Sequence, residues 1–289
     1  MDMSSRRCLT GAFILLILAA LLVPACAQEA TAGEAEPLVY SRYIDVPGVG
    51  EWYYYAQNDP EWNRSYYEPK NAEVLRRFGS GGCGPTSLAI ALSRVLTPEE
   101  MTALHEHRNP QSVAFGYCAC SVSTHHCSSN HEILRVRTPE EFLHNMPRVL
   151  GCYATGGNDM YKKYRGEFAG TSLAIFEDVA EDYGLDYWGT SDWEKASAAL
   201  ARGAGVITTV TKGIFTGSSH YMAVAGEHEG YIYILDPLMR TEYELDVQHV
   251  LTVVEPGLVR ASMDDFDKLE LYGYYIIERP AETQEESAE

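Results

Sequence analysis

The run Gly-Gly-Cys-Gly-Pro-Thr-Ser at residues 81–87 constrains the fold of this chain more than any other feature. Small residues surround one cysteine, Cys83, and Pro85 suits the first turn of a helix, where the N–H that proline lacks would have no partner. Leu88 and Leu92 then recur at helical spacing, which predicts that one face of the helix is buried. The sequence therefore predicts a single thiol at the N-terminus of a core helix.

The position of this cysteine favours its reactive form. The positive end of the helix dipole and the free N–H groups of the first turn both stabilise a thiolate, which is the nucleophilic form of cysteine. The neighbouring glycines let a substrate backbone approach closely. The run thus indicates a site that attacks a carbonyl group, with a buried cysteine in a tight turn as the competing interpretation.

Three other residues supply what a cysteine nucleophile needs. Such a nucleophile requires a base, a partner that orients the base, and a hydrogen-bond donor for the developing oxyanion. His220 is the candidate base, Asp236 the candidate orienting carboxylate and Gln57 the candidate oxyanion donor. Together with Cys83 they form the predicted catalytic set.

A predicted hairpin brings the histidine and the aspartate together. Residues 219–226 and 231–236 are rich in Tyr, Ile, Val and Met, which is typical of strands. With residues 227–230 as the turn, the pairing places His220 within one residue of Asp236. We therefore expect the imidazole and the carboxylate to lie side by side.

These segments together resemble a known group of enzymes. Gln-Asn-Asp-Pro-Glu-Trp, Gly-Gly-Cys-Gly-Pro-Thr-Ser, and Ser-His-Tyr followed by Leu-Asp-Pro are similar to the papain-like cysteine peptidases of family thirty-nine, named for peptidases that process bacteriocins after double-glycine leaders. The resemblance runs from about Tyr40 to about Ile277. It implies a nucleophile, a general base, an orienting carboxylate and an oxyanion donor, which are Cys83, His220, Asp236 and Gln57 in that order.

The expected order of elements agrees with such a fold. Helix starts are predicted at Thr97 and Thr138, where Thr precedes Pro and two glutamates. Further helices are expected over Gly170–Tyr183 and Asp192–Arg202, and further strands over Gly205–Thr211, Thr241–Leu245 and Leu271–Glu278. Helices followed by an antiparallel sheet predict an α+β fold. The resemblance implies that this fold is papain-like, with the cysteine on the helical half and the histidine and the aspartate on the β half.

The chain also departs from the bacteriocin-processing members. Those members sit at the cytosolic front of an ABC transporter, and nothing in this sequence resembles one. An insertion rich in Cys and His, at about residues 106–159, has no counterpart in the family. A leader peptide is therefore not the expected substrate.

The N-terminus has the pattern of an export signal. Two arginines precede the apolar stretch Ala12–Val23, and Ala-Cys-Ala offers a small-residue cleavage site, so residues 1–27 are predicted to be a secretory signal peptide. The alternative is a lipoprotein, cut before Cys26 and lipidated on that thiol. We expect a secreted or extracytoplasmic protein that meets a membrane only through the signal or such a lipid.

Export changes how the remaining cysteines are interpreted. In an oxidising compartment we expect two disulfides among the four cysteines left after the signal region and the nucleophile, which are Cys118, Cys120, Cys127 and Cys152. Zinc binds Cys and His side chains, so a metal site is one alternative, with candidate ligands Cys118, Cys120, His125, His126, Cys127 and His131. Free thiols are the other alternative. No cofactor is predicted for the catalytic chemistry.

The domain organisation and charge complete the prediction. A flexible tether is expected at residues 28–38, one peptidase domain at 39–279 and an acidic disordered tail at 280–289. The formal net charge of −19 argues against a nucleic-acid partner, which would need a basic surface. It is compatible with cationic peptides or polycationic wall material, and solubility alone also explains it.

The sequence therefore predicts an exported cysteine peptidase that acts on peptides or proteins through a thioacyl intermediate. An acyl transferase or a cell-wall peptide amidase on the same fold remains open, because the acyl-enzyme chemistry is shared. A secreted binding module without catalysis is the alternative from another class.

Overall fold

The computed structural model describes residues 39–60, 65–67, 76–101, 143–147, 150, 171–244 and 246–281. They belong to one unit, Val39–Glu289. The predicted signal and tether, most of the Cys/His-rich insertion and most of the acidic tail lie outside the described residues.

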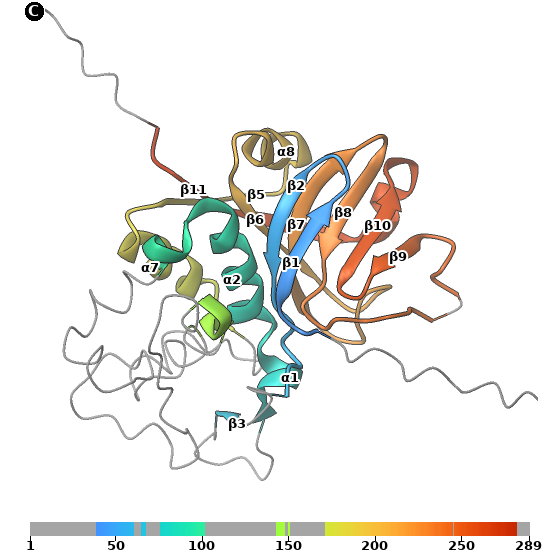
Figure 1. Ribbon diagram of the computed structural model, residues 1–289. Coiled ribbons are helices and arrows are strands. Elements are labelled where there is room, and N and C mark those ends of the chain that lie inside the picture. The colour runs from blue at the N-terminus through green and yellow to red at the C-terminus, as the bar shows by residue number, and fades with distance from the viewer. Residues whose placement is uncertain are drawn as a thin grey trace, which may run out of the picture. The chain divides into compact units, whose positions relative to one another are not determined.

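Seven strands form one antiparallel sheet in the order β5-β11-β6-β7-β8-β10-β9 (Figure 1). Their bounds are Asp186–Thr190 (β5), Gly205–Val210 (β6), His220–His228 (β7), Tyr231–Leu235 (β8), Leu251–Glu255 (β9), Leu258–Ser262 (β10) and Leu271–Glu278 (β11). The central strands are rich in β-branched and apolar residues because both of their faces are covered. The α+β, papain-like fold is thereby confirmed.

Alternate residues of the central strands face two different layers. Ile207 and Ala223 pack in one cluster with helix α2 (Cys83–Val95), whereas their neighbours Val206 and Val224 pack in a second cluster with helix α8 (Trp193–Ala201). This alternation is the period-two pattern of a strand. The sheet therefore lies between two covers, and α2 belongs to the first.

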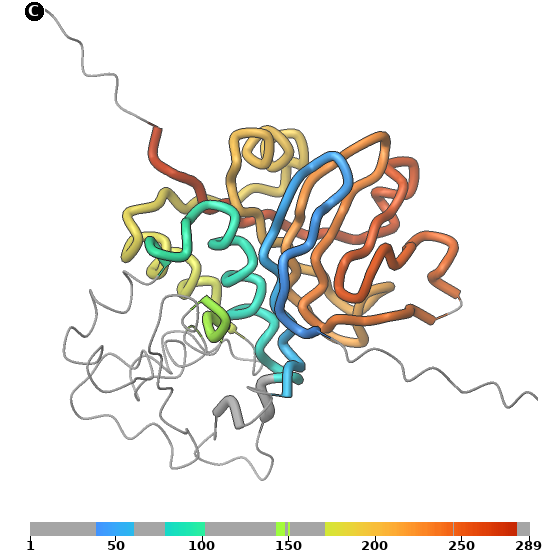
Figure 2. The backbone as a smooth tube through the Cα atoms, in the orientation of Figure 1, coloured from blue at the N-terminus to red at the C-terminus, as the bar shows by residue number. Residues whose placement is uncertain are grey.

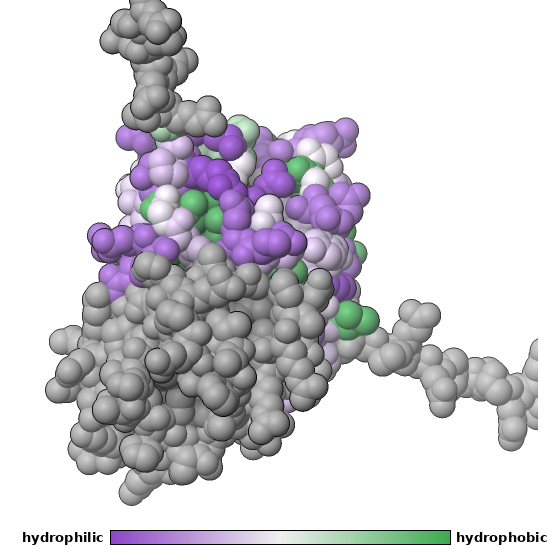
Figure 3. Space-filling view, turned by 60° about the vertical axis from the view of Figure 1, so that its left-hand side comes forward, coloured by the Kyte–Doolittle hydropathy of each residue, from purple (hydrophilic) through white to green (hydrophobic). Residues whose placement is uncertain are grey.

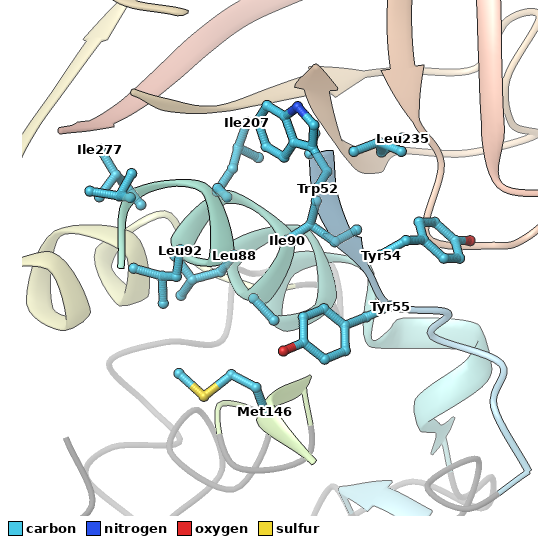
Figure 4. Packing of buried hydrophobic residues seen from close by; sticks show 14 of the residues in the cluster. Trp52, Tyr54, Tyr55, Leu88, Ile90, Leu92, Met146, Ile207, Leu235 and Ile277 are labelled. Atoms are coloured by element: carbon cyan, nitrogen blue, oxygen red, sulfur yellow. The ribbon is translucent and has the colours of Figure 1, made fainter. Parts of the chain in front are cut away.

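The first cover also contains the hairpin of β1 (Arg42–Val46) and β2 (Gly50–Tyr54). Figure 4 shows Trp52 of β2 and Ile90 of α2 meeting Ile207 and Leu235 of the sheet in one core. The tube in Figure 2 shows that this N-terminal hairpin, in blue, runs beside strands from the C-terminal half of the chain.

Helix α2 is buried along most of its length. The short helix α1 (Phe78–Gly81) leads into it, and Gly82 precedes its first residue without a side-chain cap. The sheet comes so close that a Cβ on Gly205 would lie 2.3 Å from the carbonyl oxygen of Ala91. Glycine is needed there, because any side chain would collide with the backbone of the helix.

Three of the other predicted helices are found in the described residues, whereas the start predicted at Thr138 lies outside them. Asp192 accepts a hydrogen bond from the backbone N–H of Glu194 at 3.0 Å and caps α8. Thr97 and Glu100 form a reciprocal capping box, with distances of 2.8 and 3.3 Å. Helix α7 (Ala174–Asp182) lies inside its predicted range.

Two details of the β prediction were wrong. The turn between β7 and β8 has only two residues, Glu229 and Gly230, both at positive φ as a tight hairpin turn requires. A bulge between Val224 and Gly226 then shifts the register, so the predicted pairing does not hold. The predicted strand at 241–245 is also absent from the described residues 241–244, where the Tyr243 carbonyl accepts from the Gln248 side chain and not from a neighbouring strand.

The remaining described elements are peripheral. A two-stranded sheet pairs β3 (Ser65–Tyr67) with β4 (Arg76–Arg77), and a 3₁₀ helix, η1 (Met263–Leu269), connects β10 to β11. Within the described ranges, no helix is both long enough and apolar enough to cross a membrane. Hydrophilic residues predominate over the described surface on the face drawn in Figure 3.

Candidate active site

His220 and Asp236 meet at one end of the β7–β8 hairpin. His220 is the first residue of β7 and Asp236 directly follows β8, so both are placed by the edge of the same pair of strands. Nε2 of His220 lies 2.8 Å from Oδ1 of Asp236, and both side chains are buried. Because a carboxylate accepts, Nε2 carries the proton in this bond, which leaves Nδ1 as the ring nitrogen for another partner.

That partner is Cys83, the first residue of α2. Its partly exposed thiol forms a hydrogen bond with the His220 ring and also receives backbone N–H groups from Tyr221 and Gly84. The helix start and the sheet edge therefore bring the cysteine, the histidine and the aspartate into one continuous chain.

The charges of the three groups support one another. Burial alone would raise the pKa of Cys83, but the bond and charge of His220 lower it below its ordinary value of 9.0. Burial alone would lower the pKa of His220, but Asp236 and Cys83 raise it to about 9. Burial opposes ionisation of Asp236 as well, yet His220 and Arg240 bring its pKa down to about 2. The arrangement favours a thiolate beside an imidazolium.

Four donors surround the Asp236 carboxylate, two on each oxygen. Oδ1 accepts from His220 and from the backbone N–H of Leu238 at 2.9 Å. Oδ2 accepts from Nη1 of Arg240 at 3.0 Å and from the Tyr243 hydroxyl at 2.7 Å. A fully buried carboxylate needs such partners to remain charged.

The backbone of Asp236 is held from both sides. The Tyr54 hydroxyl donates to its carbonyl at 2.6 Å, and its N–H donates to the carbonyl of Gly257 at 2.8 Å. The sequence analysis did not find Tyr54, Arg240 or Tyr243. The sequence signal for Arg240 and Tyr243 was an arginine and a tyrosine shortly after Leu-Asp-Pro. A strand was expected at 241–245, so these side chains were not identified as partners of Asp236.

Gln57 lies in the turn after β2 and is only 3% exposed. Its backbone N–H donates to the carbonyl of Pro237 at 2.7 Å, and Nε2 donates to the carbonyl of Gly79 in α1 at 2.8 Å. The residue thus connects the Asp236 loop to the segment that leads into Cys83. Nε2 retains a second N–H, whereas Oε1 has no hydrogen-bond partner among the residues that the structure describes.

Thr171 lies against the glycine that follows the cysteine. A Cβ on Gly84 would lie 2.5 Å from Cβ of Thr171, so only glycine fits. The Tyr221 hydroxyl donates to the Thr171 carbonyl at 3.1 Å and holds this segment in place. This neighbour was not identified as a site residue, because it is distant in sequence from both partners.

The predicted disulfide and metal residues lie outside the described residues. These are Cys118, Cys120, His125, His126, Cys127, His131 and Cys152. Among the described residues, Cys83 is a free cysteine, and no group of three or more His, Cys, Asp or Glu is placed to hold a metal ion.

One comparison of the sequence with known protein families gives a match. The family model described as Peptidase_C39 like family matches residues 51–254, a range that includes all four predicted catalytic residues. A search of curated proteins finds no match. The family match covers most of the chain, and it places a cysteine-peptidase-like sequence on the fold described above. The chain belongs to the Peptidase_C39 like family.

Proposed function

We propose that this protein is an exported cysteine peptidase that hydrolyses peptide bonds through a thioacyl-enzyme on Cys83. The observation that carries the proposal is the buried chain from Cys83 through His220 to Asp236, with its lowered thiol pKa and raised imidazole pKa. A cysteine held only for packing would not need a charged histidine and a buried carboxylate beside it.

In the first half-reaction the Cys83 thiolate attacks the carbonyl carbon of the scissile peptide bond. A C–S bond forms and the carbonyl oxygen takes the negative charge. The second N–H of Gln57 Nε2 is the side-chain donor for that oxyanion, since the first is bonded to Gly79. The His220 imidazolium then gives its proton to the leaving nitrogen as the C–N bond breaks.

In the second half-reaction water attacks the thioester. His220, now neutral, accepts a proton from the water, the C–S bond breaks, and the acid product leaves with the thiolate restored beside the imidazolium. Asp236 keeps Nε2 protonated and the ring oriented throughout. An amine in place of water would give acyl transfer by the same steps.

Export is part of the proposal and rests on the N-terminal sequence. The arginines, the apolar stretch Ala12–Val23 and the small residues that follow it support translocation, after which the domain would act outside the cytoplasm. The acidic charge of −19 fits peptides that carry basic residues.

The direct test incubates the purified protein with a diverse peptide mixture and with stem peptides of the cell wall, and follows the products by mass spectrometry. We expect new peptide termini with the wild type and none with Cys83→Ser or His220→Ala. Equal product formation by Cys83→Ser would exclude the proposed nucleophile. Peptides that bind to the wild type without any acyl-enzyme or product would support the binding module instead.

A further inference from the structure

Two residues outside the predicted catalytic set hold the far oxygen of the Asp236 carboxylate. Arg240 donates from Nη1 to Oδ2 at 3.0 Å, and Tyr243 donates from its hydroxyl to the same atom at 2.7 Å. Asp236 itself is fully buried. The oxygen that does not face His220 is therefore as firmly bonded as the one that does.

These two donors are themselves held in place. The Arg240 guanidinium lies 5.1 Å from the centre of the Tyr243 ring, a cation–π contact, and the Arg240 carbonyl accepts from the N–H of Gly257 at 3.3 Å. The Tyr243 ring packs edge-on against Phe215 at 6.1 Å, and Gln248 donates to its carbonyl at 2.9 Å. Burial raises the pKa of Tyr243, so its hydroxyl stays protonated and can only donate to the carboxylate.

The geometry explains why such donors matter for the neighbouring histidine. A carboxylate can turn about its Cβ–Cγ bond, and a turn would carry Oδ1 away from Nε2 of His220. Donors on Oδ2 from a second direction prevent that rotation. The titratable and charged side chains that face Asp236 are His220 from β7, Tyr54 from β2, and Arg240 and Tyr243 from the loop that follows Asp236.

We propose that Arg240 and Tyr243 are positioning residues that lock the Asp236 carboxylate with Oδ1 directed at His220. This inference rests on the proposed function, because it assigns a task to the same site. Its alternative is that the two residues only neutralise and stabilise a buried charge.

Substitution of Arg240 distinguishes the two roles, because they predict opposite shifts in the pH at which Cys83 forms its thiolate. Removing a cation that merely neutralises Asp236 would leave the carboxylate more negative toward His220 and would lower the pH at which Cys83 forms its thiolate. Removing a positioning residue lets the carboxylate turn away, weakens the support of His220 and raises that pH. We expect Arg240→Met to raise the pH midpoint of thiolate formation at Cys83 by about one pH unit. Arg240→Lys keeps a charged donor, so its midpoint should lie between those of Arg240→Met and the wild type.

Tyr243→Phe is the second variant, because it changes no charge and keeps the ring packing. We expect kcat to fall about tenfold with little change in KM, as for loss of one hydrogen bond to a charged group that orients the base. The matched control is Tyr183→Phe, which also removes one tyrosine hydroxyl bond, 2.5 Å long, to the carbonyl of Met101 and has no contact with Asp236.

The experiment measures the rate of iodoacetamide labelling of Cys83 against pH in these variants, together with peptide turnover and unfolding in urea. The proposal predicts raised midpoints for Arg240→Met and Tyr243→Phe and an unchanged midpoint for Tyr183→Phe. Unchanged or lowered midpoints, with only a loss of stability like that of Tyr183→Phe, would overturn it. Labelling needs no substrate, so a shifted midpoint without any peptide turnover would reject the proposed function and leave this inference standing.

Discussion

The backbone N–H of Gln57 donates to the carbonyl of Pro237, the residue next to Asp236, at 2.7 Å. This bond joins the turn after β2 to the loop after β8, so the Gln57 side chain is positioned relative to Asp236 and not only to the helix that begins at Cys83. A side-chain substitution leaves the backbone bond in place. The contribution of the amide to turnover can therefore be measured without separating the two loops.

Gln57→Ala should lower kcat on the order of a hundredfold, because the oxyanion loses its side-chain donor. Iodoacetamide labelling of Cys83 creates no oxyanion, so its rate should stay close to that of the wild type. Parallel turnover and labelling assays check this. Full turnover in Gln57→Ala would remove Gln57 from the proposed mechanism, and equal loss in both assays would indicate a general disturbance of the site.

Asp236→Asn should be costly for both activity and stability. Each carboxylate oxygen faces two donors, so either orientation of an amide places its NH₂ group against two of them. We expect the free energy of unfolding to fall by about 1–3 kcal/mol, as for a buried group left without partners, and kcat to fall about a hundredfold. Urea titration and peptide turnover measure the two effects. A variant as stable as the wild type would contradict the donor arrangement.

The pH dependence follows from the raised pKa of His220 and the lowered pKa of Cys83. Labelling of Cys83 should rise through a midpoint below 9.0, the ordinary thiol value. Turnover also needs protonated His220, so it should decline as the pH rises through about 9. The same protonated histidine should stabilise the fold fully below pH 6.5 and lose that contribution as the pH rises through about 9. His220→Ala should move the labelling midpoint upward, and a midpoint indifferent to this change would contradict the pairing.

Gly84→Ala should disturb the site through sterics alone. The added Cβ would lie 2.5 Å from Cβ of Thr171, and Thr171 is held by the Tyr221 hydroxyl, so either the helix start or the Thr171 segment must shift. We expect a loss of about 1–3 kcal/mol in unfolding free energy and slower labelling of Cys83. Gly217→Ala is the matched control, because nothing lies within 4 Å of the added atom there. Equal behaviour of the two variants would refute the close contact.

The cysteines predicted to form disulfides can be examined directly. Mass mapping of the non-reduced protein should find Cys118, Cys120, Cys127 and Cys152 in two pairs, with Cys83 free to react. Stoichiometric zinc with all four thiols reduced would instead establish the metal alternative.

The sequence was informative where function depends on a few neighbouring residues. The helix start around Cys83 follows from local chemistry, since small residues, Pro85 and the apolar period act within two turns. The proximity of His220 and Asp236 survived an error in register, because one opens β7 and the other directly follows β8. Adjacency at a hairpin end is set by the strand limits, and a bulge in the middle changes it little.

The residues that sequence reasoning missed act over long range or without a periodic signal. Tyr243 was expected in a strand, yet its carbonyl accepts from the Gln248 side chain and its hydroxyl donates to a buried carboxylate seven residues earlier. Thr171 and Tyr54 reach the site only after distant segments pack together. No local pattern encodes such contacts.

The separation of Cys83 from β7 along the chain has a consequence for synthesis. Until the chain has reached His220, the Cys83 thiol lacks the imidazole and the Tyr221 N–H that lower its pKa, and it has only the Gly84 N–H of its own helix. Reactivity therefore appears only when the C-terminal half of the sheet has been made and has docked on the helix. Full activation of the nucleophile thus depends on residues from the other half of the chain.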